Sequence, residues 1–162
     1  MLAIEFAVLN ILVLPLAEAY IEQRMLDAAK TVLRELLDIF DGIVSHNVAD
    51  QLGHVRSMIG LARVGWYEGR WSETRQSLEH ALVLTEKYKT FSKRNFYIGV
   101  IYLFLSIVNF ELHMYSESQS TLASANDILC EQVPRHFMPG MGSYFLEHLW
   151  RSARSLQWPS AS

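Results

Sequence analysis

Apolar residues recur at helical spacing along most of the chain. Between Leu26 and Phe40 they fall at Ala29, Val32, Leu33, Leu36, Leu37 and Phe40, the pattern of one face of an amphipathic helix. Comparable spacing predicts helices from Leu2 or Ile4 to Glu22, from Val48 to Glu68, from Ser72 to Tyr88, from Ser92 or Asn95 to Leu112, from Ser116 to Leu129 or Cys130, and from Ser143 to about Leu156. The chain is therefore predicted to be all-α.

Residues with special backbone or capping properties set the expected ends of these helices. Pro15 removes a backbone hydrogen bond within the first helix, so a kink or break is expected near residues 11–14. Asp41-Gly42 should stop the second helix, with Gly42 accepting a left-handed conformation. Candidate N-caps of the later helices are Ser45 or Asn47, Ser72, Ser92 or Asn95, and Ser116 in capping-box spacing with Gln119.

The stretch Gly60 to Leu84 has the pattern of two antiparallel helices joined by a Gly-Arg-Trp turn, and it recurs. A copy lies 44 residues downstream, with Tyr115 at the position of Trp71, and a weaker copy lies 46 residues upstream, with Met25 at that position. Such units bury their apolar faces by stacking on one another. We therefore predict a single domain over residues 1–162, with hairpins at roughly 2–41, 47–89 and 93–130 and a capping helix at about 143–156.

This stretch resembles a tetratricopeptide repeat. The residues that carry the family's pattern are Leu61, Ala62, Trp66, Gly69, Trp71, Thr74, Leu78 and Ala81. Gly65 stands where the family usually has an aromatic residue, and Thr74 where it usually has alanine. Because the period exceeds the usual length of about 34 residues, the resemblance is to long-repeat members. It implies a right-handed α-solenoid of about three hairpins, closed by a C-terminal capping helix.

In the resembled family the first helix of each hairpin builds a concave wall that binds partner proteins. Carried over to this chain, the resemblance implies a partner-binding surface of Tyr20, Arg56, Ile59, Arg63, Trp66, Tyr67, Leu103, Ile107 and Phe110. The clamp that holds a peptide's terminal carboxylate in chaperone-binding members is absent, because its positions carry Val13, Ala17, Gly60, Val100 and Phe104. An apolar groove with aromatic and arginine anchors suits an amphipathic helix or an extended hydrophobic segment. In a tightly wound solenoid the same residues would be core.

The sequence thus favours a protein–protein interaction scaffold, either a whole protein or a fragment of a larger one. The alternative is a regulatory domain that binds a peptide or a small apolar effector in an interhelical cavity near Trp66, Tyr102 and Phe110. No catalytic motif is present, so we do not expect an enzyme. The apolar stretch Met1 to Leu16 could mediate homo-oligomerisation.

Composition limits the expected cellular compartment and the expected classes of binding partner. Hydrophobic residues make up 51% of the chain and charged residues 19%, a balance that favours a packed core over disorder. Net charge is −3 with Lys and Arg scattered, so neither nucleic acid nor an anionic membrane is expected as partner. Cys130 is the single cysteine, which excludes an intrachain disulfide and favours an intracellular setting, cytoplasmic or nuclear. We expect it to be a buried, inert thiol.

Two apolar stretches resemble membrane or signal segments, and six histidines are possible metal ligands. Met1 to Leu16 lacks a basic start and contains Glu5 and Asn10, which argues against a signal peptide. Phe96 to Phe110 is uncharged for 15 residues, short of the roughly 20 needed to span a membrane, so a buried helix is expected. The histidines are His46, His54, His80, His113, His136 and His148. Their spacing is not that of a metal site, so no metal or cofactor is expected. Surface or turn positions are predicted for all six. His113 stands at the position equivalent to Gly69.

Overall fold

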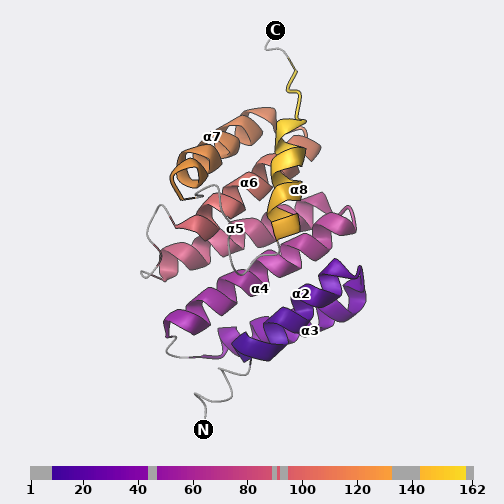
Figure 1. The fold of residues 1–162 in the computed structure, drawn as a ribbon, viewed down its shortest axis with the longest axis vertical. Helices are drawn as coiled ribbons and strands as arrows, with labels where there is room; N and C mark the ends of the chain where they lie inside the picture. The colour runs from indigo at the N-terminus through magenta and orange to yellow at the C-terminus, as the bar shows by residue number, and fades with distance from the viewer. Residues whose placement is uncertain (1–8, 44–46, 89–90, 92–94, 133–142, 160–162) are drawn as a thin grey trace. The chain divides into compact units, whose positions relative to one another are not determined.

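The computed structural model describes residues 9–43, 47–88, 91, 95–132 and 143–159 (Figure 1). It contains a π-helical turn η1 (Leu9–Val13) and the α-helices α2 (Leu14–Glu22), α3 (Leu26–Asp41), α4 (Val48–Tyr67), α5 (Trp71–Lys87), α6 (Phe96–Glu111), α7 (Tyr115–Gln132) and α8 (Ser143–Arg154). No strand occurs in these ranges, and the prediction of an all-α chain is confirmed.

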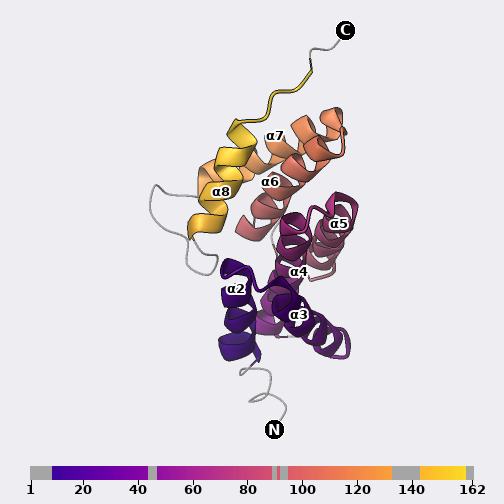
Figure 2. The same ribbon diagram turned by 90° about the vertical axis from the view of Figure 1, so that its right-hand side faces the viewer.

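The chain divides into two compact units, Met1–Thr90 and Phe91–Ser162, and we describe each by itself. In the first unit α3 packs against α2 and α4, and α5 packs against α4. In the second unit α7 and α8 both pack against α6 (Figure 2). The single domain and the right-handed solenoid stay predictions.

Three helix pairs, α2/α3, α4/α5 and α6/α7, are joined by turns of the same backbone geometry. Each turn contains one residue with positive φ: Arg24 at 60°, Gly69 at 73° and His113 at 59°. The next residue's N–H donates to the carbonyl five residues earlier, from Met25 to Tyr20, from Arg70 to Gly65 and from Met114 to Asn109, at 2.9, 2.8 and 2.8 Å. This is the Schellman ending of a helix. The equivalence of His113 and Gly69 is thus confirmed.

These turns correct the predicted offset between the first and second helix pairs. The left-handed residues lie 45 and 44 residues apart, so the first helix pair is displaced by 45 residues from the second, not by 46. Leu26, which begins α3, therefore stands at the position of Trp71, where the sequence comparison had placed Met25. The reason is that Met25 closes the turn, as Arg70 does in the next one.

Two of the predicted helix caps are present. The side chain of Asn47 accepts a hydrogen bond from the N–H of Asp50 at 2.8 Å and begins α4. The side chain of Asn95 accepts one from the N–H of Tyr97 at 2.9 Å and begins α6. The alternative caps Ser45 and Ser92 lie outside the described residues.

Other predicted boundary residues have different roles. Ser72 and Ser116 are not caps, because α5 begins at Trp71 and α7 at Tyr115, directly after the turns, which places both serines inside the first helical turn. Gly42 follows α3 as predicted, but its φ of −80° is ordinary right-handed backbone. The expected left-handed glycine is therefore wrong at Gly42.

The helix changes type near Pro15, where a kink or break was predicted. The π-helical turn of η1 ends at Val13, and α2 begins at Leu14. Pro15 lies in the first turn of α2, where a helix has no partner for the missing N–H. Leu14, Ala17 and Ile21 of α2 then pack into the core of the first unit.

The prediction for Phe96 to Phe110 is also confirmed, because α6 is buried on most of its sides. Phe104 of α6 packs edge-to-face on Phe145 of α8, with ring centroids 5.6 Å apart. The hydroxyl of Ser118 on α7 donates to the carbonyl of Ser106 on α6 at 2.6 Å, which fixes a close approach of the two helices. No helix among the described residues combines the length and the apolar character that crossing a membrane requires.

Candidate functional site

Aromatic side chains gather where α2 and α4 reach their turns, and we call Tyr20, Arg24, Trp66 and Tyr67 the aromatic edge. The rings of Trp66 and Tyr67 are stacked, with centroids 5.5 Å apart and an interplanar angle of 23°. The guanidinium carbon of Arg24 lies 3.8 Å from the centroid of Tyr67. The three aromatic residues are half-buried and Arg24 is exposed. This edge therefore presents apolar ring surface and a positive charge to solvent.

The turn backbone positions Arg24 over the ring. Because Arg24 is the left-handed residue, its side chain leaves the turn beside the carbonyl end of α2, and its Nη1 atom donates to the carbonyl of Ile21 at 3.0 Å. Tyr20 and Tyr67 both pack against the core cluster of the first unit, which anchors the edge from below. Arg24 was not among the predicted site residues. At the 46-residue offset it stood at the position of Arg70, and only the turn conformation shows that it is equivalent to Gly69.

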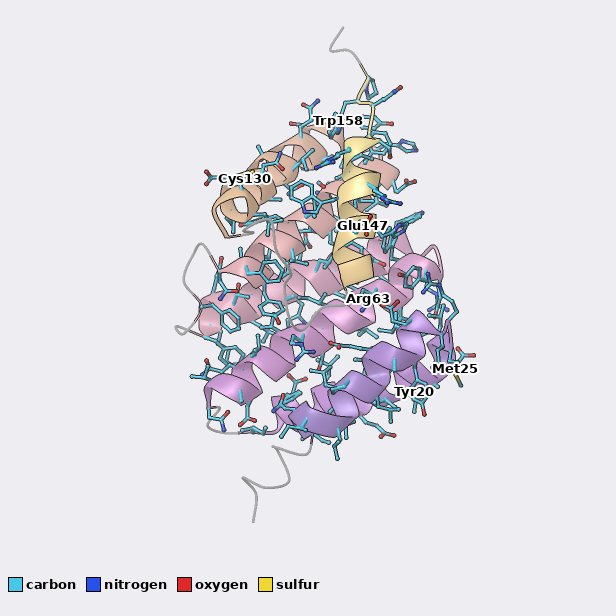
Figure 3. The ribbon with its side chains drawn as sticks, in the orientation of Figure 1. Tyr20, Met25, Arg63, Cys130, Glu147 and Trp158 are labelled. Atoms are coloured by element: carbon cyan, nitrogen blue, oxygen red, sulfur yellow. The ribbon has the colours of Figure 1, made fainter. Side chains whose placement is uncertain are left out.

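The two arginines of the predicted partner-binding surface, Arg56 and Arg63, form ion pairs with α2. Arg56 forms an ion pair with Glu18 at 2.7 Å, and the Nη2 atom of Arg63 donates to the carboxylate of Glu22. Arg63 is 3% exposed and Ile59 1% exposed. Both ion pairs join α4 to α2, so the two arginines lie where these helices meet, as Figure 3 shows for Arg63.

The predicted residues of α6 belong to the second unit. Leu103 and Ile107 are buried, whereas Phe110 is half-buried and packs edge-to-face on Tyr115 and Trp158, with ring centroids 5.3 and 6.3 Å away. Of the predicted surface, Tyr20, Trp66 and Tyr67 thus belong to the first unit. A groove that also includes α6 stays a prediction.

A buried histidine joins three helices of the first unit. His54 is 1% exposed. Its Nδ1 atom lies 2.7 Å from the hydroxyl of Tyr88, its Nε2 atom lies 3.1 Å from a carboxylate oxygen of Asp41, and its ring stacks on Phe40 with centroids 5.5 Å apart. The surface or turn position predicted for His54 is therefore wrong. His80, His113 and His148 are exposed as predicted, and His46 and His136 lie outside the described residues.

The electrostatics of this group keep Tyr88 protonated. Burial raises the pKa of Tyr88 above its usual value, and the carboxylates of Asp41 and Asp50 raise it further because they disfavour a second negative charge. The Nδ1 atom of His54 is hydrogen-bonded to the Tyr88 hydroxyl, and its Nε2 atom lies beside the Asp41 carboxylate. The group therefore ties together the ends of α3 and α5 and the middle of α4.

A cavity of about 450 Å³ lies between α7 and α8. It is lined by Leu122, Asn126 and Cys130 of α7 and by Trp150, Ala153 and Arg154 of α8. Cys130 is exposed, so the buried thiol predicted from the sequence is wrong. The reason is that α8 packs mainly on α6 and leaves this side of α7 open (Figure 3).

A second cavity, of about 60 Å³, lies among α3, α4 and α5. Lys30, Glu68 and Arg70 line it and form ion pairs, Lys30 with Glu68 at 2.8 Å and Arg70 with Glu68 at 2.9 Å. A space this small and polar suits water. Over the described ranges, no three His, Cys, Asp or Glu side chains converge as a metal site would require.

The predicted association surface is described only from Leu9 onward. There Ile11, Leu12 and Leu16 are 69%, 62% and 46% exposed, and Pro15 beside them is exposed too. Self-association through this surface stays a prediction, which the molar mass in solution would test.

Comparison of the chain with protein-family models, with curated proteins and with solved structures finds no match. The resemblance to tetratricopeptide repeats therefore depends on the residues of this chain.

Proposed function

We propose that this chain is a tetratricopeptide-like interaction module that binds a partner peptide or helix at the aromatic edge. The observation that carries the proposal is the half-buried stack of Trp66 and Tyr67 with Arg24 over the Tyr67 ring. Tryptophan, tyrosine and arginine are the residue types that contribute most binding energy at protein interfaces. A stack that is fixed before binding also loses little side-chain entropy when a partner docks.

Repetition of the turns supports the tetratricopeptide-like part of the proposal. Three left-handed residues at 45- and 44-residue spacing close helix pairs in the same way. Ala29, Thr74 and Ser118 follow these turns at equivalent positions, and all three are buried. Small residues at such places allow paired helices to approach closely, as in the repeats that the sequence resembles.

Site-specific crosslinking would test the proposal. A photoreactive phenylalanine analogue at Trp66 keeps an aromatic ring in the stack, and the same analogue at Val83, 58% exposed on α5, serves as the matched control. We expect the Trp66 variant to crosslink one polypeptide in extracts of the source cells, in competition with unlabelled protein, and the Val83 variant not to do so. The same crosslinks from both positions, or none from Trp66, would overturn the proposal.

The second proposed function, a regulatory domain that binds a small apolar effector, is supported by the cavity between α7 and α8. Its described lining residues do not include Trp66, Tyr102 or Phe110, the residues predicted for such a cavity. Protection of the Cys130 thiol by apolar ligands would test this function directly.

A further inference from the structure

The cavity between α7 and α8 is open to solvent and has the volume of a small-molecule site. Its volume of about 450 Å³ falls within the roughly 300–1,000 Å³ that is usual for small-molecule sites. Leu122, Asn126 and Cys130 are spaced i, i+4, i+8 on α7, so they form one stripe of that helix. Trp150 and Arg154, spaced i, i+4, form the facing stripe on α8. Two helical stripes thus form the walls.

Most of the wall is apolar. Leu122 and the indole of Trp150 are half-buried, and Ala153 is 3% exposed between the helices. An apolar group that enters this space removes hydrocarbon and indole surface from water, which favours binding in proportion to the area covered. The body of the ligand is therefore hydrocarbon or aromatic.

One of the six described lining residues of this cavity carries a charge. Arg154 is the only charged residue among the six, and its guanidinium carbon lies 5.8 Å from the centroid of the Trp150 ring. Neighbouring Arg151 instead forms an ion pair with Glu147 at 2.6 Å. None of the six described lining residues carries a carboxylate, so none of them repels an anion. Guanidinium binds carboxylate through two parallel hydrogen bonds, and the Asn126 amide adds a further donor.

We propose that this cavity binds an apolar carboxylate, a molecule with a hydrocarbon or aromatic body and one carboxylate beside Arg154. The proposal rests on the second proposed function and names the ligand class for it. A cationic ligand would be repelled by Arg154. A neutral apolar ligand would leave the guanidinium unused.

The only cysteine of the chain makes the test direct. Cys130 lines the cavity and is exposed, so its alkylation by iodoacetamide measures access to this space at one defined atom. Decanoate, used below its micelle concentration, is the probe, with decanol and decylamine as neutral and cationic counterparts. We expect decanoate to slow alkylation at lower concentration than either counterpart.

Two substitutions on α8 distinguish the loss of the Arg154 charge from a general effect on folding. Arg154→Gln should raise the concentration of decanoate needed for half protection by about tenfold or more, because it removes a charge-assisted hydrogen bond. Arg151→Gln, on the same helix and outside the lining, is the matched control and should leave protection unchanged. Circular dichroism of both variants verifies that α8 still forms part of a folded chain.

Each outcome bears on a different proposal. Protection that favours decanoate and is weakened by Arg154→Gln alone supports the carboxylate site. Equal protection by decanoate and decanol, or unchanged protection of the Arg154→Gln variant, would contradict recognition of a carboxylate. The proposal of an apolar effector site would then still hold. Absence of protection by all three ligands overturns both.

Discussion

The imidazole of His54 and the hydroxyl of Tyr88 form a hydrogen bond of 2.7 Å in the interior of the first unit. His113 and Tyr115 form the same bond at the same distance on the surface. The partners of the first pair are 34 residues apart in the chain and those of the second are two apart. One chain therefore contains the same bond in a buried and in an exposed environment.

Replacement of each tyrosine should show what burial adds to this bond. Tyr88→Phe removes the buried hydroxyl that is hydrogen-bonded to the Nδ1 atom of His54, which should lower the free energy of unfolding by about 1–3 kcal/mol. Tyr115→Phe should cost less than about 0.5 kcal/mol, because water replaces the lost hydroxyl. Urea denaturation followed by circular dichroism measures both. Equal losses would contradict the structural role of the buried pair.

The raised pKa of Tyr88 predicts a loss of stability at alkaline pH. The folded state holds the phenolic proton to higher pH than the unfolded chain, in which tyrosine titrates near its usual value of 10.0. This contribution to the free energy of unfolding is therefore complete below that pH, and it is lost as pH rises toward the folded-state pKa.

The Tyr88→Phe variant isolates this effect because it lacks the titrating group. The difference in free energy of unfolding between the wild-type chain and this variant should shrink as pH rises from about 9 to about 11. Urea midpoints across that range measure the difference. A difference that stays constant or grows would show that Tyr88 titrates no later in the folded chain than in the unfolded one.

Apolar spacing, with the expected helix ends, predicted the bounds of α3 and α4 to within one residue. The second predicted helix, 26–40, is α3 at Leu26–Asp41, and the third, 48–68, is α4 at Val48–Tyr67. Serine caps failed at Ser72 because the Schellman turn leaves only Arg70 between the left-handed residue and α5. A sequence shows which residues can cap a helix, but the preceding turn decides where that helix begins.

Contacts between residues far apart in the chain could not be predicted from the sequence. A lone histidine on a helix is usually exposed, and the burial of His54 depends on Asp41 and Tyr88 approaching from two other helices. The pairing of Arg56 with Glu18 similarly depends on α2 packing along α4. Of the candidate site, the aromatic residues could be predicted by their type, but Arg24 depends on its turn conformation.

The contrast between Gly69 and Gly42 can be tested by alanine substitution. Gly69 has φ of 73°, and a Cβ atom there would meet nothing within 4 Å, so Gly69→Ala measures backbone strain alone. It should lower the free energy of unfolding by about 1–2 kcal/mol. Gly42→Ala, at φ of −80° and with only ordinary 3.5 Å contacts, should be neutral or stabilising by up to about 1 kcal/mol. Thermal denaturation distinguishes them, and equal losses would contradict the left-handed assignment.

Gly65 and Thr74 form the close approach of α4 and α5. A Cβ atom on Gly65 would lie 2.6 Å from the Oγ1 atom of Thr74, so Gly65→Ala should destabilise the chain by about 1–3 kcal/mol. Tyr20 and the smaller Ala29 hold the equivalent positions in the first helix pair. Removal of Oγ1 by Thr74→Ala should therefore relieve the clash.

A double-mutant cycle tests this coupling. The variant with both substitutions should be more stable than Gly65→Ala alone, even though Thr74→Ala loses the 2.8 Å hydrogen bond to the carbonyl of Arg70. Alanine also favours the helix over glycine by about 1 kcal/mol at position 65, a gain that appears once the contact is relieved. We expect an interaction energy of at least about 1 kcal/mol from urea denaturation of the four proteins. Strict additivity would mean that the two helices move apart to accommodate the methyl group.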